Sequence, residues 1–151
     1  AKGDRNTMSI KMFKFNTEDG LPYPVYSSEG AAGLDLFATK DYGILPYKST
    51  AIGTGVGFII PTGWVGLLTG RSGLAFRKGI EGRLGIIDSD YRGEVQALLW
   101  NMTGADYMVR KGDKIAQIVF VPCYHGAIEY ISKDQADETL RGEKGFGSTG
   151  Y

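Results

Sequence analysis

One stretch, residues 85–95, dominates the pattern of the chain and reads Gly85-Ile86-Ile87-Asp88-Ser89-Asp90-Tyr91-Arg92-Gly93-Glu94-Val95. An apolar run, 84–87, enters this polar stretch, and a second apolar run, 95–100, leaves it. Two β-rich runs around a short polar linker are typical of a β-hairpin. The predicted tip carries more charge than a turn needs. It is either a solvated turn or a carboxylate base beside an aromatic ring that faces a flat ligand.

Glycine makes up 23 of the 151 residues, about twice its usual share of about 7%. Helix interiors tolerate glycine poorly, so the composition favours strands joined by tight turns. Short β-rich runs separated by turn residues are typical of an all-β sandwich or barrel. We therefore expect an all-β fold with one short helix that starts near Ser72 or Gly73. The expected strands cover 10–15, 42–47, 50–61, 64–69 and 115–122.

The charge balance and the cysteine count exclude several functional classes. The chain has 17 basic and 17 acidic residues, so no net field attracts a polyanion and no stable nucleic-acid binding is expected. Cys123 is the only cysteine, which excludes an intrachain disulfide and a cysteine metal site. No apolar run could span a membrane and no signal peptide is visible. We expect a soluble, intracellular protein in which residues 1–8 are a leader or a cloning remnant.

Four isolated polar residues are candidates for binding, and each has a plainer interpretation. Asp35 lies inside an apolar run, where it faces a partner, a metal ion, solvent or a turn that it caps. Arg71 and Ser72 precede the expected helix, where they form an anion site or an ordinary helix start. Gln117 is a structural amide or a ligand contact. The only histidine, His125, is expected to be structural or exposed rather than catalytic.

The C-terminal segment, residues 141–151, is rich in glycine and ends Gly145-Phe146-Gly147-Ser148-Thr149-Gly150-Tyr151. Most such tails have no function of their own. This one places an aromatic ring between glycines, with two hydroxyls after it and basic residues before it. The composition suits a mobile arm that stacks on a ring and wraps around anions.

Five stretches resemble, in order, the motifs of the trimeric dUTP diphosphatases (dUTPases). Five matches with family spacing are specific, whereas one alone would be weak. They lie between residues 31 and 150 and read Ala32-Gly33-Leu34-Asp35-Leu36, Arg71-Ser72-Gly73-Leu74-Ala75, Gly85 to Gly93, Gly112 to Gln117, and Arg141 to Gly150.

The resemblance implies a jelly-roll-like β-barrel over residues 9–131, followed by an arm over residues 132–151. It also implies a homotrimer whose active sites are shared. One subunit supplies the first, second and fourth motifs, the next supplies residues 85–93, and the third supplies the arm. The implied reaction converts dUTP and water to dUMP and pyrophosphate with Mg2+. The expected partners are therefore dUTP and further copies of the chain.

The resemblance also assigns residue roles. Asp88 matches the carboxylate that activates water, and Asp35 matches the one that holds Mg2+ through water. Phe146 matches the ring that stacks on uracil, and Tyr91 matches the residue that packs against the deoxyribose. The implied substrate-binding positions are Arg71, Ser72, Gly73 and Gln117 at the phosphates, Gly85, Ile86, Ile87 and Tyr91 at the nucleoside, and Arg141, Phe146, Gly147, Ser148 and Thr149 in the arm.

The chain departs from the family pattern at four positions. Gly70 stands where the family usually has proline, and Gly82 stands where some members carry a polar residue near the uracil. Arg83 lies where a small or apolar residue is expected, and Lys144 replaces a common glycine.

Three alternatives to a dUTPase remain at this point. One is the related dCTP deaminase, which shares the fold but needs a catalytic glutamate. Another is a binding module that holds dUTP and presents it to a partner. The third is a β-sandwich without activity, which would need all five motif matches to be accidental.

Overall fold

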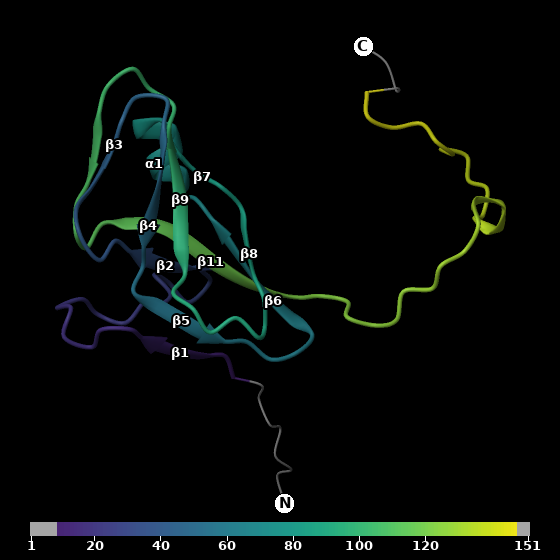
Figure 1. Ribbon diagram of the computed structural model, residues 1–151, viewed down its shortest axis with the longest axis horizontal. Helices are drawn as coiled ribbons and strands as arrows, with labels where there is room; N and C mark the ends of the chain where they lie inside the picture. The colour runs from purple at the N-terminus through teal and green to yellow at the C-terminus, as the bar shows by residue number, and fades with distance from the viewer. Residues whose placement is uncertain (1–8, 148–151) are drawn as a thin grey trace, which may run out of the picture.

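The computed structural model describes residues 9–147 (Figure 1). This part of the chain folds mainly into short strands, with one α-helix and one turn of 3-10 helix. The strands are β1 (Lys11–Lys14), β2 (Leu34–Phe37), β3 (Tyr42–Ile44), β4 (Ser49–Gly53), β5 (Val56–Ile59), β6 (Trp64–Thr69), β7 (Ile80–Gly82), β8 (Gly85–Ile87), β9 (Gln96–Asn101), β10 (Tyr107–Val109) and β11 (Lys114–Pro122). The helices are α1 (Ser72–Lys78) and η1 (Lys133–Gln135).

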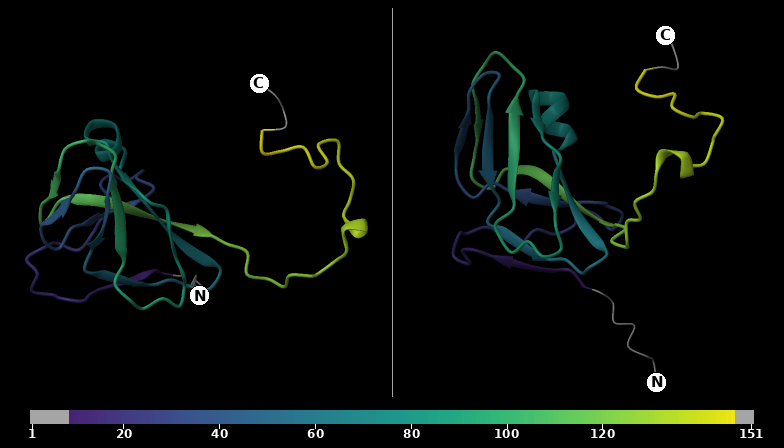
Figure 2. Two further views of the ribbon diagram at one scale, coloured as in Figure 1. Left: turned by 45° about the horizontal axis from the view of Figure 1, so that its top comes forward. Right: turned by 45° about the vertical axis from the view of Figure 1, so that its right-hand side comes forward.

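The strands form antiparallel sheets that wrap around one core. The largest sheet has the order β2-β11-β6-β8, a second has the order β4-β9-β7, and two pairs join β1 to β5 and β10 to β3. Figure 2 shows the sheets folded over one another, with α1 at one end of the body. The fully buried side chains at the centre include Leu36, Ile52, Phe58, Leu99 and Ile118. The predicted all-β, jelly-roll-like fold with a short helix is confirmed.

Most strand predictions agree with the structure. Strand β6 covers the predicted range 64–69, and β1, β3 and β11 lie at the predicted places. The single strand predicted over 50–61 is two strands, because Gly55 adopts a φ of 70° between β4 and β5. Helix α1 begins at Ser72 as predicted and ends before Gly79, whose φ of 65° gives a left-handed C-cap. Strands β2, β7 and β10 were not among the predicted strands.

The predicted β-hairpin around residues 85–95 is wrong. Strand β8 pairs with β6, whereas β9 pairs with β4 and β7 in a different sheet. The second apolar run is held elsewhere, because the backbone N–H of Val95 donates to the Val56 carbonyl at 2.8 Å and the Val95 carbonyl accepts from Thr54 at 3.2 Å. Residues 88–95 therefore form a link between two sheets.

A buried ion pair fixes the loop after β1. The Nζ atom of Lys14 donates to Asp19 Oδ1 at 2.7 Å and to the Leu21 carbonyl at 2.5 Å. The two charged side chains are only 4% and 9% exposed. The hydrogen bond from Lys14 holds the pKa of Asp19 below its ordinary value. Burial of both charges makes this contact a structural anchor rather than a surface pair.

After β11 the chain leaves the body of the protein (Figures 1 and 2). Its large side chains are exposed, including Tyr124, Tyr130, Leu140 and Phe146. This segment contains the 3-10 turn η1. No helix within residues 9–147 is both long enough and apolar enough to cross a membrane.

Candidate active site

Three of the five motifs meet at one cavity of about 260 Å³. Strand pairing explains the meeting. Gln117 of β11 lies opposite Asp35 of β2 on one side and opposite Thr69 of β6 on the other. The three residues form one row across adjacent strands, and Arg71 follows two residues after the end of β6. The cavity is lined by Ser27, Ala31, Ala32, Gly33, Asp35, Arg71, Ser72, Gly73 and Gln117.

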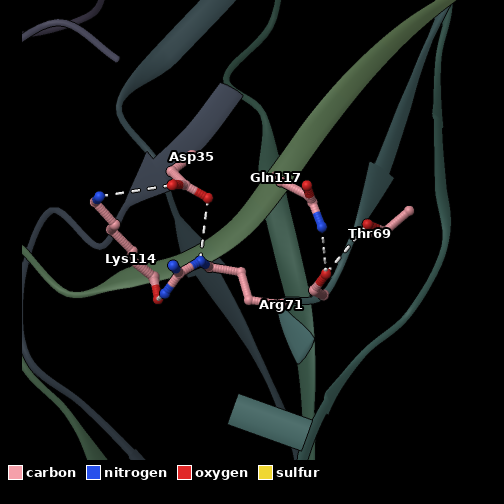
Figure 3. Close-up of polar contacts among 6 residues, drawn as sticks. Asp35, Thr69, Arg71, Lys114 and Gln117 are labelled. Atoms are coloured by element: carbon pink, nitrogen blue, oxygen red, sulfur yellow. Dashed lines mark hydrogen bonds and ion pairs between the residues drawn. The ribbon is translucent and has the colours of Figure 1, made fainter. Parts of the chain in front are cut away.

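The Asp35 carboxylate is the electrostatic centre of this cavity (Figure 3). Arg71 Nε donates to Asp35 Oδ1 at 3.1 Å, and Lys114 Nζ lies 3.6 Å from Oδ2. Arg71 Nη1 also donates to the Lys114 carbonyl at 3.4 Å. The Asp35 side chain is 13% exposed, so its charge is balanced by two basic groups rather than by bulk water. Sequence reasoning missed Lys114, because nothing in the pattern distinguished it from other lysines.

Gln117 is held by the backbone of the loop that precedes α1. Its Nε2 atom donates to the Gly70 carbonyl at 3.3 Å, and Thr69 Oγ1 donates to the same carbonyl at 3.1 Å (Figure 3). The amide nitrogen therefore has a backbone partner, as the structural interpretation predicted, and the residue also lines the cavity. Both interpretations of Gln117 are compatible with this geometry.

The start of α1 offers hydrogen-bond donors to the same cavity. Arg71 is the N-cap residue, with an extended backbone, and no cap hydrogen bond from a side chain within residues 9–147 is found. Ser72 and Gly73 are exposed in the first turn. Because the first backbone N–H groups of a helix lack partners within the helix, this segment can donate to the oxygens of a phosphate.

The residues that line this cavity could hold a hydrated Mg2+ ion, but they could not surround the ion with protein ligands alone. Asp35 is the acidic residue in the cavity lining, and the described residues hold no cluster of three or more His, Cys, Asp or Glu suited to a metal ion. Mg2+ keeps several waters and binds largely to substrate phosphates. Since both oxygens of Asp35 already have basic partners, the carboxylate fits an ion contacted through water.

Asp88, Tyr91 and Glu94 line a second cavity, of about 340 Å³. Asp88 is exposed and opens a turn in which the Tyr91 N–H donates to its carbonyl at 3.2 Å. The Tyr91 hydroxyl donates to the Glu94 carbonyl at 2.9 Å. A Cβ on Gly93 would lie 2.3 Å from that hydroxyl, so the absence of a side chain at Gly93 leaves room for Tyr91. The remaining lining residues are Ile86, Ile87, Val95 and Gln96.

Arg92 holds the turn of Asp88 in place. Its Nη1 atom donates to the Ser89 carbonyl at 2.7 Å and to the Phe58 carbonyl of β5 at 3.4 Å. The turn is thereby attached to a strand of another sheet. Sequence reasoning did not assign this role, since the Phe58 carbonyl lies far away in the chain and no local signal points to it.

The two cavities share no lining residue among those described. Strands β2 and β8 are the opposite edges of the four-stranded sheet, and three strand spacings correspond to about 14 Å. The strand register adds a second offset: Ile87 lies opposite Gly66, whereas Gln117 and Asp35 lie level with Thr69. Asp88 and Asp35 of one chain thus lie near opposite edges of the sheet and at different levels along its strands.

The arm residues lie apart from both cavities. Arg141 Nε donates to the Lys144 carbonyl at 2.7 Å, which closes a local turn. The Phe146 ring is fully exposed. Gly147 is the last described residue, so the predicted contacts of Ser148 and Thr149 lie outside the described part of the chain. The predicted site residues therefore fall in three separate places in a single chain.

Comparisons with known proteins agree on one family. The family model described as dUTPase matches residues 19–150. A deoxyuridine 5'-triphosphate nucleotidohydrolase of Ehrlichia canis is 39% identical over 145 residues, which are 93% of this chain and 94% of the relative. One of Mesorhizobium japonicum is 46% identical over 138 residues, covering 87% and 84%. The solved dUTPase of Staphylococcus bacteriophage 80alpha with dUPNHPP superposes with a TM-score of 0.86 at 26% identity, covering 95% of this chain and 99% of that one. The chain belongs to the dUTPase family.

Proposed function

We propose that this protein hydrolyses dUTP to dUMP and pyrophosphate. The observation that carries the proposal is the first cavity, in which the Asp35 carboxylate, the Arg71 guanidinium and the Gln117 amide converge beside the start of α1. A cluster of donors beside one shielded carboxylate suits a polyphosphate that arrives with a hydrated cation. The relatives named above are nucleotidohydrolases of deoxyuridine triphosphate, which identifies the nucleotide.

The reaction follows from the roles of three groups. Asp88 accepts a proton from a water molecule as that water attacks the α-phosphorus. A bond forms from the water oxygen to phosphorus, the bond from phosphorus to the α,β-bridging oxygen breaks, and pyrophosphate leaves. Arg71 and the N–H groups of Ser72 and Gly73 stabilise the charge that develops on the phosphate oxygens. Bound Mg2+ supplies further neutralisation of the triphosphate charge.

The distribution of these groups favours a shared site in a homotrimer. The Asp88 cavity and the Asp35 cavity lie near opposite edges of one sheet, so one chain does not bring the base to the phosphates that it must serve. A neighbouring copy can supply the missing half. The exposed arm, with Phe146 for the uracil ring, completes the site from a third copy.

Discrimination between nucleotides rests on the second cavity. Tyr91 packs against the deoxyribose, where the 2′-hydroxyl of a ribonucleotide would collide with its ring. The backbone of Gly85, Ile86 and Ile87 hydrogen-bonds the edge of uracil. Cytosine presents the opposite order of donors and acceptors, so it would leave buried polar groups unpaired.

The test is pyrophosphate release in the presence of Mg2+ from dUTP, UTP, dTTP and dCTP. Release from dUTP alone supports the reaction and the role of Tyr91. Ammonia release from dCTP without pyrophosphate from dUTP would instead identify a deaminase. Tight binding of dUTP without turnover would identify a nucleotide-binding module on the same scaffold.

A further inference from the structure

Two glycines outside the predicted substrate contacts lie against each other at backbone distance. Gly70 follows β6, and Gly82 ends β7. A Cβ on Gly70 would lie 2.7 Å from the Gly82 nitrogen, and one on Gly82 would lie 2.6 Å from the Gly70 Cα. Neither residue is among those with positive φ, so alanine would meet no conformational strain. The close approach of two backbones, rather than the backbone conformation, requires glycine at both positions.

The other side of Gly70 faces Gln117. The Gly70 carbonyl accepts the hydrogen bond from Gln117 Nε2 at 3.3 Å. Gly33 packs closely against the Gln117 amide, because a Cβ on Gly33 would lie 2.6 Å from Gln117 Oε1. The contacts run without a gap from Gly33 through Gln117 and Gly70 to Gly82. We call these four residues the glycine stack.

The glycine stack fixes the position of Arg71, which follows Gly70 in the chain. Gly70 is bonded to Arg71, whose Nε holds Asp35 at 3.1 Å and whose main chain begins α1. A backbone atom cannot move aside as a flexible side chain can, so a Cβ on either Gly70 or Gly82 must displace the loop by several tenths of an ångström. Such a displacement moves Arg71, Ser72 and the Gln117 hydrogen bond together.

We propose that Gly33, Gly70 and Gly82 are positioning residues that set the phosphate-binding geometry of Arg71 and Gln117. This inference rests on the proposed function, because it assumes that the first cavity binds the phosphates of dUTP. A positioning role differs from a purely structural one in its dependence on the ligand. Misplaced donors weaken the binding of phosphates and leave the nucleoside contacts in place, whereas a general loss of folding weakens both.

The experiment measures affinity for three ligands that differ in phosphate number: deoxyuridine, dUMP and dUPNHPP. The variants Gly70→Ala and Gly82→Ala should raise the Kd for dUPNHPP about tenfold or more, with a smaller rise for dUMP and no rise for deoxyuridine. Two controls accompany them. Gly43→Ala places its Cβ 3.8 Å from the nearest atom and should change no affinity. Ile52→Val removes a methylene from a fully buried residue and should lower Tm without changing the ratio of the affinities.

A second variant keeps the inference testable if Gly70→Ala or Gly82→Ala fails to fold. The three atoms nearest to a Cβ on Gly33 all belong to the Gln117 side chain, whose amide can rotate away, so Gly33→Ala should fold. It should weaken dUPNHPP binding in the wild-type background and have little further effect in a Gln117→Ala background, because the two positions act through one group. Equal losses for all three ligands, or additive losses in the double variant, would overturn the inference. Absence of pyrophosphate release from dUTP by the wild-type protein would instead overturn the proposed function.

Discussion

Mixing two inactive variants tests whether one active site draws on more than one chain. The first variant is Arg71→Ala, which removes the proposed phosphate donor, and the second is Asp88→Asn, which removes the proposed base. The two residues line different cavities. Three strand spacings, about 14 Å, separate the sheet edges to which the cavities belong, whereas a general base works at about 3 Å from its proton. Each variant alone should therefore lose almost all hydrolysis of dUTP.

The expected recovery can be calculated. If each site takes Arg71 from one subunit and Asp88 from the next, an equal mixture supplies an intact Arg71 half of the time and an intact Asp88 half of the time. Random assembly of a closed ring then restores about one quarter of the sites. If both residues act within one chain, every chain carries one defect and no site is restored.

The assay unfolds the two variants together in denaturant, refolds them as one pool and measures pyrophosphate release from dUTP. Wild-type protein treated in the same way sets the reference, and the two variants refolded separately and then combined give the background. Light scattering after gel filtration checks that the refolded species has the mass of three chains. Activity no higher than the background in a refolded trimer would refute the shared site.

Three further outcomes follow from particular contacts. Deletion of residues 141–151 should remove most hydrolysis of dUTP and leave Tm unchanged, because the described residues of this segment, 141–147, lie outside the core, and failure to fold would contradict this. Gly93→Ala should push the Tyr91 ring from its place and lower the ratio of kcat/KM for dUTP over UTP about tenfold; an unchanged ratio would disprove the contact. Because Lys14 lowers the pKa of Asp19 from 3.8, the carboxylate stabilises the fold above that pH and loses this effect as the pH falls through its lowered pKa. Asp19→Asn should thus cost about 1–3 kcal/mol at pH 7, and the difference in free energy of unfolding from wild type should close below pH 3.8; a constant difference would exclude the ion pair as its source.

The fold class and the position of most strands could be predicted because they depend on local patterns. Alternation, glycine content and turn residues all report on the nearest few residues. The partner of each strand does not follow from these patterns, and the pairing of the two runs around residues 85–95 was therefore mispredicted. Nothing in that stretch shows that Val95 bonds to Thr54 and Val56 instead.

The candidate site residues that were predicted carried a local signal in the sequence, whereas those that were missed did not. Asp35, Arg71 and Gln117 each stood out as a polar residue in an unusual place, and the resemblance grouped them. Lys114 and Arg92 stood in ordinary polar turns, and their roles come from contacts with residues distant in the chain.

Two departures from the family pattern, Gly70 and Gly82, could not be explained by considering each position alone. Gly70 and Gly82 looked like two independent losses of a side chain in the sequence. In the structure each occupies the space that a Cβ of the other would need. A side chain at one position is therefore compatible with this backbone only if the two segments move apart, so the two positions must be judged together.

The link that replaces the predicted hairpin has a direct consequence for catalysis. A hairpin tip would be supported by its own two strands and would move with them. Residues 88–95 instead leave the sheet that carries Asp35 and Gln117 and enter the sheet of β4, β9 and β7. Arg92 ties the turn of Asp88 to β5 as well. Asp88, the proposed base, is thus held both by β8, which lies in the sheet of Asp35 and Gln117, and by β5, which does not. In the proposed shared site, the alignment of Asp88 with an α-phosphorus depends on how chains pack against one another, so a substitution at that interface should impair turnover without contacting the nucleotide.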